Sequence, residues 1–389
     1  MLAPAMAGAA PGVLRVATAA DYAPYALKDG GTGVLRGVDV ELARELAVDM
    51  GQSLEWVTTS WSALQADADA GRFDIAAGGV SVTAPRAALH PFSRNLHRDY
   101  KSPVVRCGEQ ARFDTLREIN TPHTRVIVNP GGTNERFARQ YFPLAQLRVH
   151  ADNATVFDEI RAGRADVMVT DLTEAKVLQA RRDGLCAAGA RARWEPMQKA
   201  WWIAAGATQR AAIDAALARA LRRESYSRRL QRWVAAPWAQ ASSDIPLQLA
   251  LLADERLAVV VEVARWKWNH EAPIEDLPRE RLLLDRLRSA AAARESPVAV
   301  EGYFAAQIDA AKQLQRDLFT RWRAAGAGKF SQVQDLDGVL RPRIDELNER
   351  MLALLVRWDG RPKPRGHFGP LTTGTLSPAA VELALRPLL

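Results

Sequence analysis

The periodicity of the sequence changes once, near residue 239, and this change constrains the fold most. From Val13 to about Trp238, short β-type runs alternate with helical stretches, whereas from Leu247 onward the pattern is helical throughout. Strands that alternate with helices are typical of βαβ units, and helices alone are typical of a bundle. The length of 389 residues allows two or three domains. We therefore predict an α/β part followed by an all-α part.

A short internal repeat divides the α/β part in two. The segment AGRFDI at 70–75 recurs as AGRADV at 162–167, and each copy follows a helix, leads into a strand and is followed by a hydroxyl-rich turn. Ligands of α/β proteins bind beyond the carboxyl ends of the strands. The repeat therefore predicts two similar lobes with a ligand cleft between them.

These patterns set the expected boundaries. Residues 1–12 are small and uncharged, and we interpret them either as the end of an export signal or as a plain leader, since a basic region and a long apolar region are both missing. The other assignments are a two-lobed domain at 13–238 (lobe 1 about 13–103 and 197–238, lobe 2 about 104–196), a linker at 239–246 and an all-α domain at 247–389, with helices at 247–270, 278–294, 297–324, 333–358 and near 378–385.

Composition excludes several classes of function. Hydrophobic residues make up 48% and charged residues 25%, which is ordinary for a globular protein, and no run approaches the roughly 20 apolar residues of a membrane span. The net charge of +7 is spread along the chain without a lysine or arginine block, so an anionic small molecule fits better than nucleic acid. Cys107 and Cys186 are too far apart for a CxxC metal or redox pair, which leaves two buried thiols or one disulfide.

Polar and aromatic residues gather at the predicted strand ends of the α/β part. Each of them alone also fits a surface or turn role, but their shared position favours a ligand site. In the second lobe, a strand end and a glycine turn lead into a helix N-terminus, whose free N–H groups suit a carboxylate. The candidates in the first lobe are Asp21, Tyr22, Trp61, Thr83, Arg86 and Lys101, the last of which lies just before the chain crosses to the second lobe. The candidates in the second lobe are Asn129 and Thr133.

The α/β part resembles the periplasmic solute-binding proteins for amino acids, and more closely the cyclohexadienyl dehydratases built on that scaffold. The match is carried by residues 14–22, 59–61, 72–76, 107–113, 127–139 and 168–174, of which the run VNPGGTN at 128–134 is the most specific. The resemblance implies export to the periplasm. It also favours a Cys107–Cys186 disulfide, because the dehydratases carry cysteines at these positions.

The resemblance implies loss of water and CO2 from prephenate, giving phenylpyruvate, and from arogenate, giving phenylalanine. The departing hydroxyl needs a proton, and a carboxylic acid supplies one near neutral pH only if burial raises its pKa. Glu174 matches the family's general acid, Arg86 the carboxylate clamp and Asp171 the position that holds an amino group. By the same resemblance, the polar contacts to the substrate are completed by Asn129, Thr133 and Lys101. The substrate ring would stack against Trp61 and Tyr22. Ala84 and Pro85 depart from the family pattern and could shift the turn before Arg86.

In the helical part, a basic stripe lies on an apolar face. Arg256 and Lys267 are eleven residues apart, about 20° past three full turns, so both point the same way among buried-type leucines and valines. Buried cations need either acids from another helix or an anionic ligand. Asp276, Arg279 and Glu280 follow in the next segment, Gln315 in the third helix and Arg350 in the fourth.

This set resembles the all-α chorismate mutases, especially their secreted branch. The match is carried by residues 255–257, 266–268, 273–279, 304–307, 315 and 344–352. The resemblance implies conversion of chorismate to prephenate without a nucleophile or cofactor. Arg256, Arg279 and Arg350 would hold the two carboxylates, and Lys267 and Gln315 would donate to the ether oxygen as its bond breaks. Asp276 and Glu280 would take the ring hydroxyl or position the arginines.

The sequence therefore predicts a bifunctional, exported enzyme of phenylalanine biosynthesis. We expect small dicarboxylates (chorismate, prephenate and arogenate) as its partners, with no cofactor, metal, nucleic acid or membrane span, and a homo-oligomer is left open. The alternative is a non-catalytic amino-acid- or carboxylate-binding protein fused to a chorismate mutase. A helical part that serves only for interaction or dimerisation is a second alternative.

Overall fold

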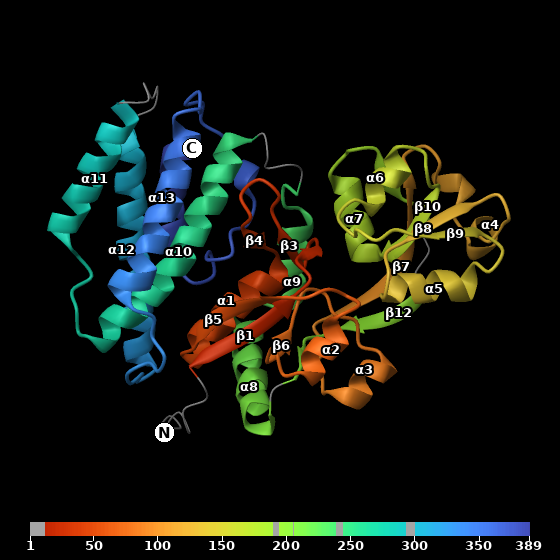
Figure 1. Ribbon diagram of the computed structural model, residues 1–389, viewed down its shortest axis with the longest axis horizontal. Helices are drawn as coiled ribbons and strands as arrows, with labels where there is room; N and C mark the ends of the chain where they lie inside the picture. The colour runs from red at the N-terminus through yellow and green to blue at the C-terminus, as the bar shows by residue number, and fades with distance from the viewer. Residues whose placement is uncertain (1–11, 190–193, 205, 239–243, 293–299) are drawn as a thin grey trace.

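The α/β part contains two main sheets, which the computed structural model places in separate lobes (Figure 1). The structure describes residues 12–389 except 190–193, 205, 239–243 and 293–299. The predicted leader, apart from Gly12, and most of the predicted linker lie outside the described residues. The fold class is the predicted one, a two-lobed α/β fold followed by helices.

The first lobe is built on a four-stranded sheet in the order β13-β6-β1-β5. The strands β5 and β6 run parallel to β1, and β13 is antiparallel to β6. Asp21 and Tyr22, expected in a loop, instead form the first strand of a small antiparallel sheet, β2-β3-β4. The elements of this lobe are β1 (Val13–Thr18), β2 (Asp21–Tyr22), β3 (Ala26–Lys28), β4 (Leu35–Arg36), α1 (Val38–Met50), β5 (Ser53–Thr58), α2 (Leu64–Asp69), β6 (Ile75–Ala76), α3 (Ala84–Leu89), β13 (Trp202–Ile203), α8 (Ala207–Arg223) and α9 (Tyr226–Val234).

The second lobe has a mixed sheet rather than the purely parallel one that the alternation predicts. The strands β10, β8 and β9 are parallel, but β7 runs antiparallel to β10, and β11 and β12 both pair antiparallel with β7. The cause is the crossing between lobes, because the chain enters on β7 and returns on β12, which pairs with it in the opposite direction. The elements are β7 (His97–Arg106), a 3-10 turn (Gln110–Arg112), α4 (Leu116–Ile119), β8 (Arg125–Val128), α5 (Thr133–Tyr141), β9 (Gln146–Val149), α6 (Val156–Arg161), β10 (Val167–Asp171), α7 (Leu172–Ala180), β11 (Leu185–Ala187) and β12 (Trp194–Lys199).

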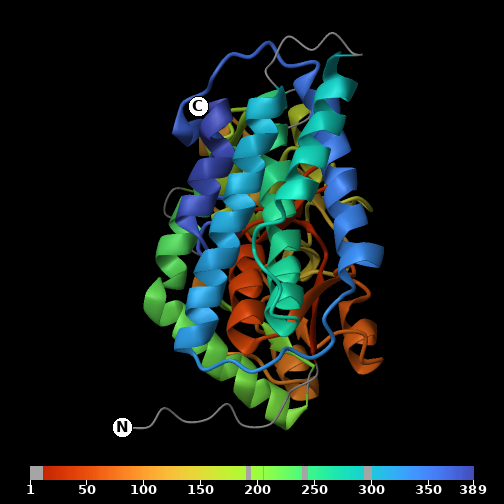
Figure 2. The same cartoon turned by 90° about the vertical axis from the view of Figure 1, so that its left-hand side faces the viewer.

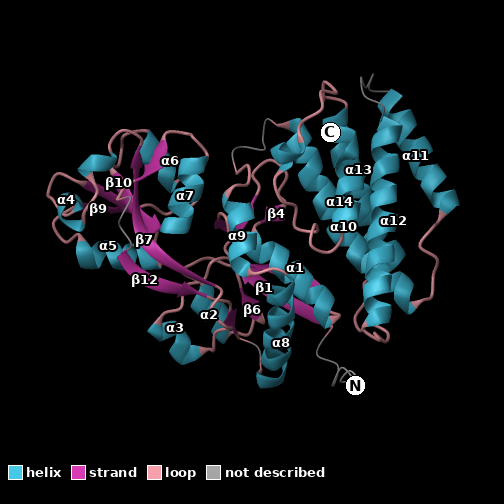
Figure 3. Ribbon diagram, turned by 180° about the vertical axis from the view of Figure 1, so that it is seen from behind, coloured by secondary structure: helices cyan, strands magenta, loops and turns pink. Residues whose placement is uncertain are grey.

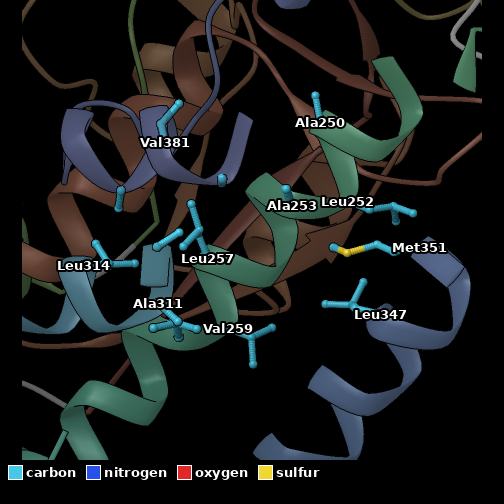
Figure 4. Packing of buried hydrophobic residues seen from close by; sticks show 14 of the residues in the cluster. Ala250, Leu252, Ala253, Leu257, Val259, Ala311, Leu314, Leu347, Met351 and Val381 are labelled. Atoms are coloured by element: carbon cyan, nitrogen blue, oxygen red, sulfur yellow. The ribbon is translucent and has the colours of Figure 1, made fainter. Parts of the chain in front are cut away.

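The helical part packs around the long helices α10 and α12. Figure 4 shows Leu257, Leu314 and Met351 of three helices pointing into one apolar core. The predicted fourth helix is shorter than expected: a π-helical turn precedes α13, and Pro342 fits the first turn of α13, where no N–H is needed. The elements are α10 (Ile245–Asn269), α11 (Leu277–Ala292), α12 (Val300–Ala324), the π-helical turn (Leu336–Leu340), α13 (Arg341–Leu355), a 3-10 turn (Arg365–Phe368), α14 (Pro378–Leu385) and a final 3-10 turn (Arg386–Leu388).

The helical part lies against the first lobe, on the side away from the second lobe (Figures 1, 2 and 3). Val34 and Val48 of lobe 1 belong to the apolar core of the helices. Polar contacts surround this junction: Arg44 of α1 donates to Glu255 and to Thr372, each at 2.7 Å. Among the described helices, none is long and apolar enough to cross a membrane.

Cys107 and Cys186 are joined by a disulfide that ties the end of β7 to β11. We expect the double variant Cys107→Ser/Cys186→Ser to lose about 2–5 kcal/mol of unfolding free energy, because the bridge closes a long loop with a separation of 79 residues. The measurement is the denaturant midpoint of the transition that reports on lobe 2, compared between oxidised wild type and the variant. Equal midpoints would contradict a stabilising bridge.

Candidate functional site

A cavity of about 420 Å³, the interlobe cleft, lies between the two α/β lobes at the carboxyl ends of the strands. Seven predicted residues line it, and Lys101 lies directly behind its wall. Two predicted residues, Asp21 and Thr83, do not line it. The lining residues are Tyr22, Trp61, Gly79, Ser81, Arg86, Asn129, Gly132, Thr133, Asn134, Asn153, Asp171, Glu174 and Lys199.

Glu174 is the candidate acid of this cleft. It lies in the first turn of α7, is 8% exposed, and accepts a hydrogen bond from the hydroxyl of Thr170. Burial raises the pKa of its carboxyl to about 8, and the negative charge of Asp171 acts in the same direction. Glu174 is therefore mostly protonated at neutral pH, so it can donate a proton to a molecule in the cleft.

Asp171 is held by two ammonium groups of the protein itself. Lys101 donates to Oδ1 at 2.7 Å, Lys199 donates to Oδ2 at 2.5 Å, and the hydroxyl of Tyr22 also donates to Oδ2. Burial acts to raise the pKa of Asp171, but the two lysines outweigh it and hold this pKa well below its usual range. Asp171, which matches the position that holds an amino group in the amino-acid binders, is thus paired here with two lysines of the same chain.

Lys199 is a residue of the cleft that sequence reasoning missed. It is 2% exposed and also donates to the carbonyl of Gly79 and the hydroxyl of Ser81, each at 2.9 Å. The sequence offers no signal for it, because a single lysine on β12 reaches Asp171 only through the crossing of the chain between the lobes. Lys101 is fully buried and donates to Thr133 at 2.9 Å and to Asn134.

Thr83 and Asp21 support neighbours instead of lining the cleft. Thr83 caps α3, since its hydroxyl accepts from the backbone N–H of Arg86 at 3.4 Å, and Pro85 lies in the first turn of this helix without disturbing it. Asp21 accepts from the indole N–H of Trp61 at 3.1 Å and so orients that ring. Burial raises the pKa of Asp21 and lowers that of Arg86.

A second cavity of about 670 Å³, the helical pocket, lies among α10, α11, α12 and α13. Six predicted residues line it, together with Arg341, Lys312 and Asp345, which sequence reasoning did not select. The lining residues are Arg256, Val263, Lys267, Ile274, Asp276, Arg279, Glu280, Leu283, Ile308, Ala311, Lys312, Gln315, Leu336, Arg341, Ile344 and Asp345.

The cations of the helical pocket differ in how they are paired. Arg256 donates to Asn348 and to the carbonyl of Gln307, and in the described part of the chain it forms no ion pair. Burial lowers the pKa of Arg256 to about 10, so the guanidinium stays charged at neutral pH. Arg279 lies 3.7 Å from Asp345. This arrangement leaves Arg256 available for an anion.

The two predicted donors to an ether oxygen line the same pocket. Lys267 donates to the carbonyl of Ile274 at 2.6 Å, and burial lowers its pKa. Gln315 donates to the carbonyl of Ala311 at 3.0 Å with one of its two amide hydrogens. Each side chain keeps further N–H groups for a ligand.

The acids of the pocket bind cations of neighbouring helices. Asp276 accepts from Arg341 at 3.2 Å, and Glu280 accepts from Lys312 at 3.1 Å. Asp276 therefore contacts an arginine, whereas the partner of Glu280 is a lysine. Among the described residues, no group of three histidine, cysteine, aspartate or glutamate side chains is arranged to hold a metal ion.

Arg350, predicted to hold a carboxylate, does not line the helical pocket. Its guanidinium donates to the carbonyl of Thr32 in lobe 1. The reason is helical geometry: Arg350 follows Arg341 by nine residues, or about two and a half turns of α13, so the two side chains face opposite sides. Arg341 takes the place in the pocket, and Arg350 belongs to the contact between the helices and lobe 1.

Comparisons with known proteins also divide the chain into an α/β part and a helical part. Residues 14–236 match the bacterial extracellular solute-binding proteins, family 3, and residues 240–316 match chorismate mutase type II. The second match ends before α13 and so does not include Arg341. Among solved structures, an ancestral amino acid-binding protein described as a precursor of cyclohexadienyl dehydratase has a TM-score of 0.52 at 28% identity, covering 57% of this chain and 96% of that one.

Two curated relatives cover different parts of the chain. A cyclohexadienyl dehydratase from Pseudomonas aeruginosa is 39% identical over 232 residues, which are 59% of this chain and 85% of that protein. A secreted chorismate mutase from Mycobacterium tuberculosis is 36% identical over 117 residues, 29% of this chain and 58% of that protein, so the chain spans little more than half of this relative. The chain therefore belongs to the family 3 bacterial extracellular solute-binding proteins and carries a chorismate mutase type II domain after that fold.

Proposed function

We propose that this protein is a bifunctional enzyme of phenylalanine biosynthesis. The helical pocket rearranges chorismate to prephenate, and the interlobe cleft converts prephenate to phenylpyruvate. The observation that carries the proposal is Glu174, a buried carboxyl group with a pKa of about 8 that faces a cleft lined by cations. A protein that only binds carboxylates has no use for such an acid, and this disfavours the alternative of a non-catalytic binding protein.

In the cleft, the chemistry is loss of water and CO2 from one substrate. Arg86 and the N-terminus of α5 at Thr133 bind the carboxylates, and Trp61 and Tyr22 lie against the ring. The proton of Glu174 goes to the ring hydroxyl, which leaves as water while the ring carboxylate leaves as CO2. The electron pair of the broken C–C bond completes the aromatic ring, and Glu174 is then reprotonated from solvent. Arogenate, processed in the same way, gives phenylalanine.

In the helical pocket, catalysis is electrostatic and needs no covalent intermediate. Arg256, Arg279 and Arg341 hold the two carboxylates of chorismate in the reactive, folded conformation. Lys267 and Gln315 donate to the ether oxygen as the C–O bond breaks and negative charge develops there.

The proposal also covers the location of the protein in the cell, its ligands and its oligomeric state. An exported protein in the periplasm fits the family of extracellular solute-binding proteins, the secreted relative and the Cys107–Cys186 disulfide. Chorismate, prephenate and arogenate are the proposed ligands. A homo-oligomer is compatible with both sites, since each is built from one chain.

A coupled assay with purified protein tests both activities at once. Chorismate is supplied, and chorismate loss and phenylpyruvate formation are followed separately. We expect both signals from wild type. Prephenate accumulating without phenylpyruvate would contradict the dehydratase activity, and unchanged chorismate would contradict the mutase activity.

We expect mutase activity to stay nearly constant from about pH 5 to about pH 8. Gln315 donates its amide hydrogen at any pH, whereas a glutamate at this position would have to be protonated first. Arg256 keeps its charge because its pKa is about 10. The measurement is kcat for chorismate across this range. A fall that follows a single pKa inside the range would refute the assignment of Gln315.

Replacing Arg341 by alanine is expected to reduce kcat/KM for chorismate by at least about tenfold, since a charge-assisted contact to a carboxylate is lost. The matched control is Arg350→Ala on the same helix, which removes the same charge from the opposite face and leaves the pocket intact. Steady-state kinetics of the two variants show whether Arg341 or Arg350 binds chorismate. A larger loss with Arg350→Ala would reverse the assignment.

A further inference from the structure

The ammonium group of Lys199 is completely satisfied by the protein. It has three N–H donors, and they go to the carbonyl of Gly79, the hydroxyl of Ser81 and Oδ2 of Asp171, at 2.9, 2.9 and 2.5 Å. The first two acceptors belong to lobe 1 and the third to lobe 2. Lys199 is therefore held in one position at the wall of the cleft, on a strand that connects the two lobes.

Asp171 already pairs with two ammonium groups of the protein, so a ligand ammonium would be the third. Oδ1 already accepts from Lys101, and Oδ2 accepts from both Lys199 and Tyr22. The other acid in the cleft wall, Glu174, is mostly protonated at neutral pH. A positively charged ligand group would therefore meet Lys199 and Arg86, while the one charged carboxylate among the lining residues is already paired with two lysines.

We infer that Lys199 determines the substrate preference of the interlobe cleft: it occupies the position where a ligand ammonium would pair with Asp171, so the cleft favours the keto acid prephenate over the amino acid arogenate. The inference rests on the proposed dehydratase function. The two substrates differ only in the group next to the side-chain carboxylate, which is an uncharged ketone in prephenate and an ammonium in arogenate. Like charges brought together in a desolvated site are unfavourable, whereas a ketone carries no such penalty.

Lys199→Met tests this inference, because methionine keeps an unbranched side chain, without the terminal nitrogen, and removes the charge. We expect wild type to have a higher kcat/KM for prephenate than for arogenate. In Lys199→Met, which frees Oδ2 of Asp171 from one partner, the prephenate-to-arogenate ratio should fall by at least about tenfold. Lys199→Arg keeps the charge and should keep the preference.

Lys101→Met is the matched control for net charge. It removes one buried cation from the same carboxylate but leaves the Lys199–Asp171 pair in place. If the ratio shifts equally in Lys101→Met and Lys199→Met, only the net charge of the cleft matters, and the positional role of Lys199 is overturned. An unchanged ratio in Lys199→Met, or a wild type without preference, would overturn it as well. The denaturant midpoint of the lobe 2 transition of each variant, compared with wild type, shows that the α/β part is folded.

Ligand binding separates this inference from the proposed function. Phenylpyruvate and L-phenylalanine differ by the same keto and amino groups, and calorimetric titration needs no turnover. We expect wild type to bind phenylpyruvate more tightly and Lys199→Met to gain affinity for L-phenylalanine. Absence of turnover of both substrates by wild type would refute the dehydratase, while this shift in binding would still support the role of Lys199. Equal shifts for both ligands would overturn that role.

Discussion

Replacing Glu174 by glutamine is expected to lower kcat for prephenate by about 10²–10⁴-fold, the usual contribution of a general acid. Glutamine keeps the size of the side chain and the contact with Thr170 but has no acidic proton. Chorismate should then be converted to prephenate at the wild-type rate, and prephenate should accumulate. Because mutase activity reports on the helical part, the denaturant midpoint of the lobe 2 transition, compared with wild type, shows that the variant is folded.

The pH dependence gives an independent test of the same residue. Burial raises the pKa of Glu174 to about 8, so the protonated form needed for catalysis is present below this pH and is lost above it. We expect kcat for prephenate to be level below about pH 8 and to fall about tenfold per unit above it.

The control for Glu174→Gln is Glu55→Gln, which changes an exposed glutamate of β5. Activity in Glu174→Gln near the wild-type level would eliminate Glu174 as the acid.

Replacing Lys267 by alanine is expected to lower kcat for chorismate by about 10²–10³-fold, as found when one donor to a developing negative charge is removed. Lys267 lies in the helical pocket and its ammonium is anchored by the carbonyl of Ile274. Because the charge on the ether oxygen appears only as the bond breaks, the loss should fall on kcat more than on KM. Chorismate consumption under saturating conditions is the measurement.

The matched control is Lys329→Ala, which removes an exposed lysine from the helical part. It should leave chorismate consumption unchanged, and dehydratase activity should survive in both variants because the interlobe cleft is untouched. If Lys267→Ala still turns over chorismate at a comparable rate, the helical pocket is assigned to the wrong residues. The helical part would then fit the alternative of an interaction bundle.

Much of the fold could be predicted because local signals mark its elements. The helix α1 ends at Met50 because the next residue, Gly51, adopts a left-handed conformation with φ of 67°. The helix α14 likewise begins at Pro378, after the cap Ser377. The helix α10 begins two residues earlier than predicted because Asp244, treated as linker, caps it.

The order of the α/β and helical parts and most residues of the interlobe cleft could be predicted from local features, namely strand ends and short motifs. Three features required the three-dimensional arrangement: Lys199 reaches Asp171, Arg341 rather than Arg350 lines the helical pocket, and β7 runs antiparallel to β10. These outcomes depend on how the chain crosses between lobes and on where α13 begins. The crossing between lobes and the start of α13 cannot be predicted from the periodicity of one segment, since both arise from packing between elements far apart in the chain.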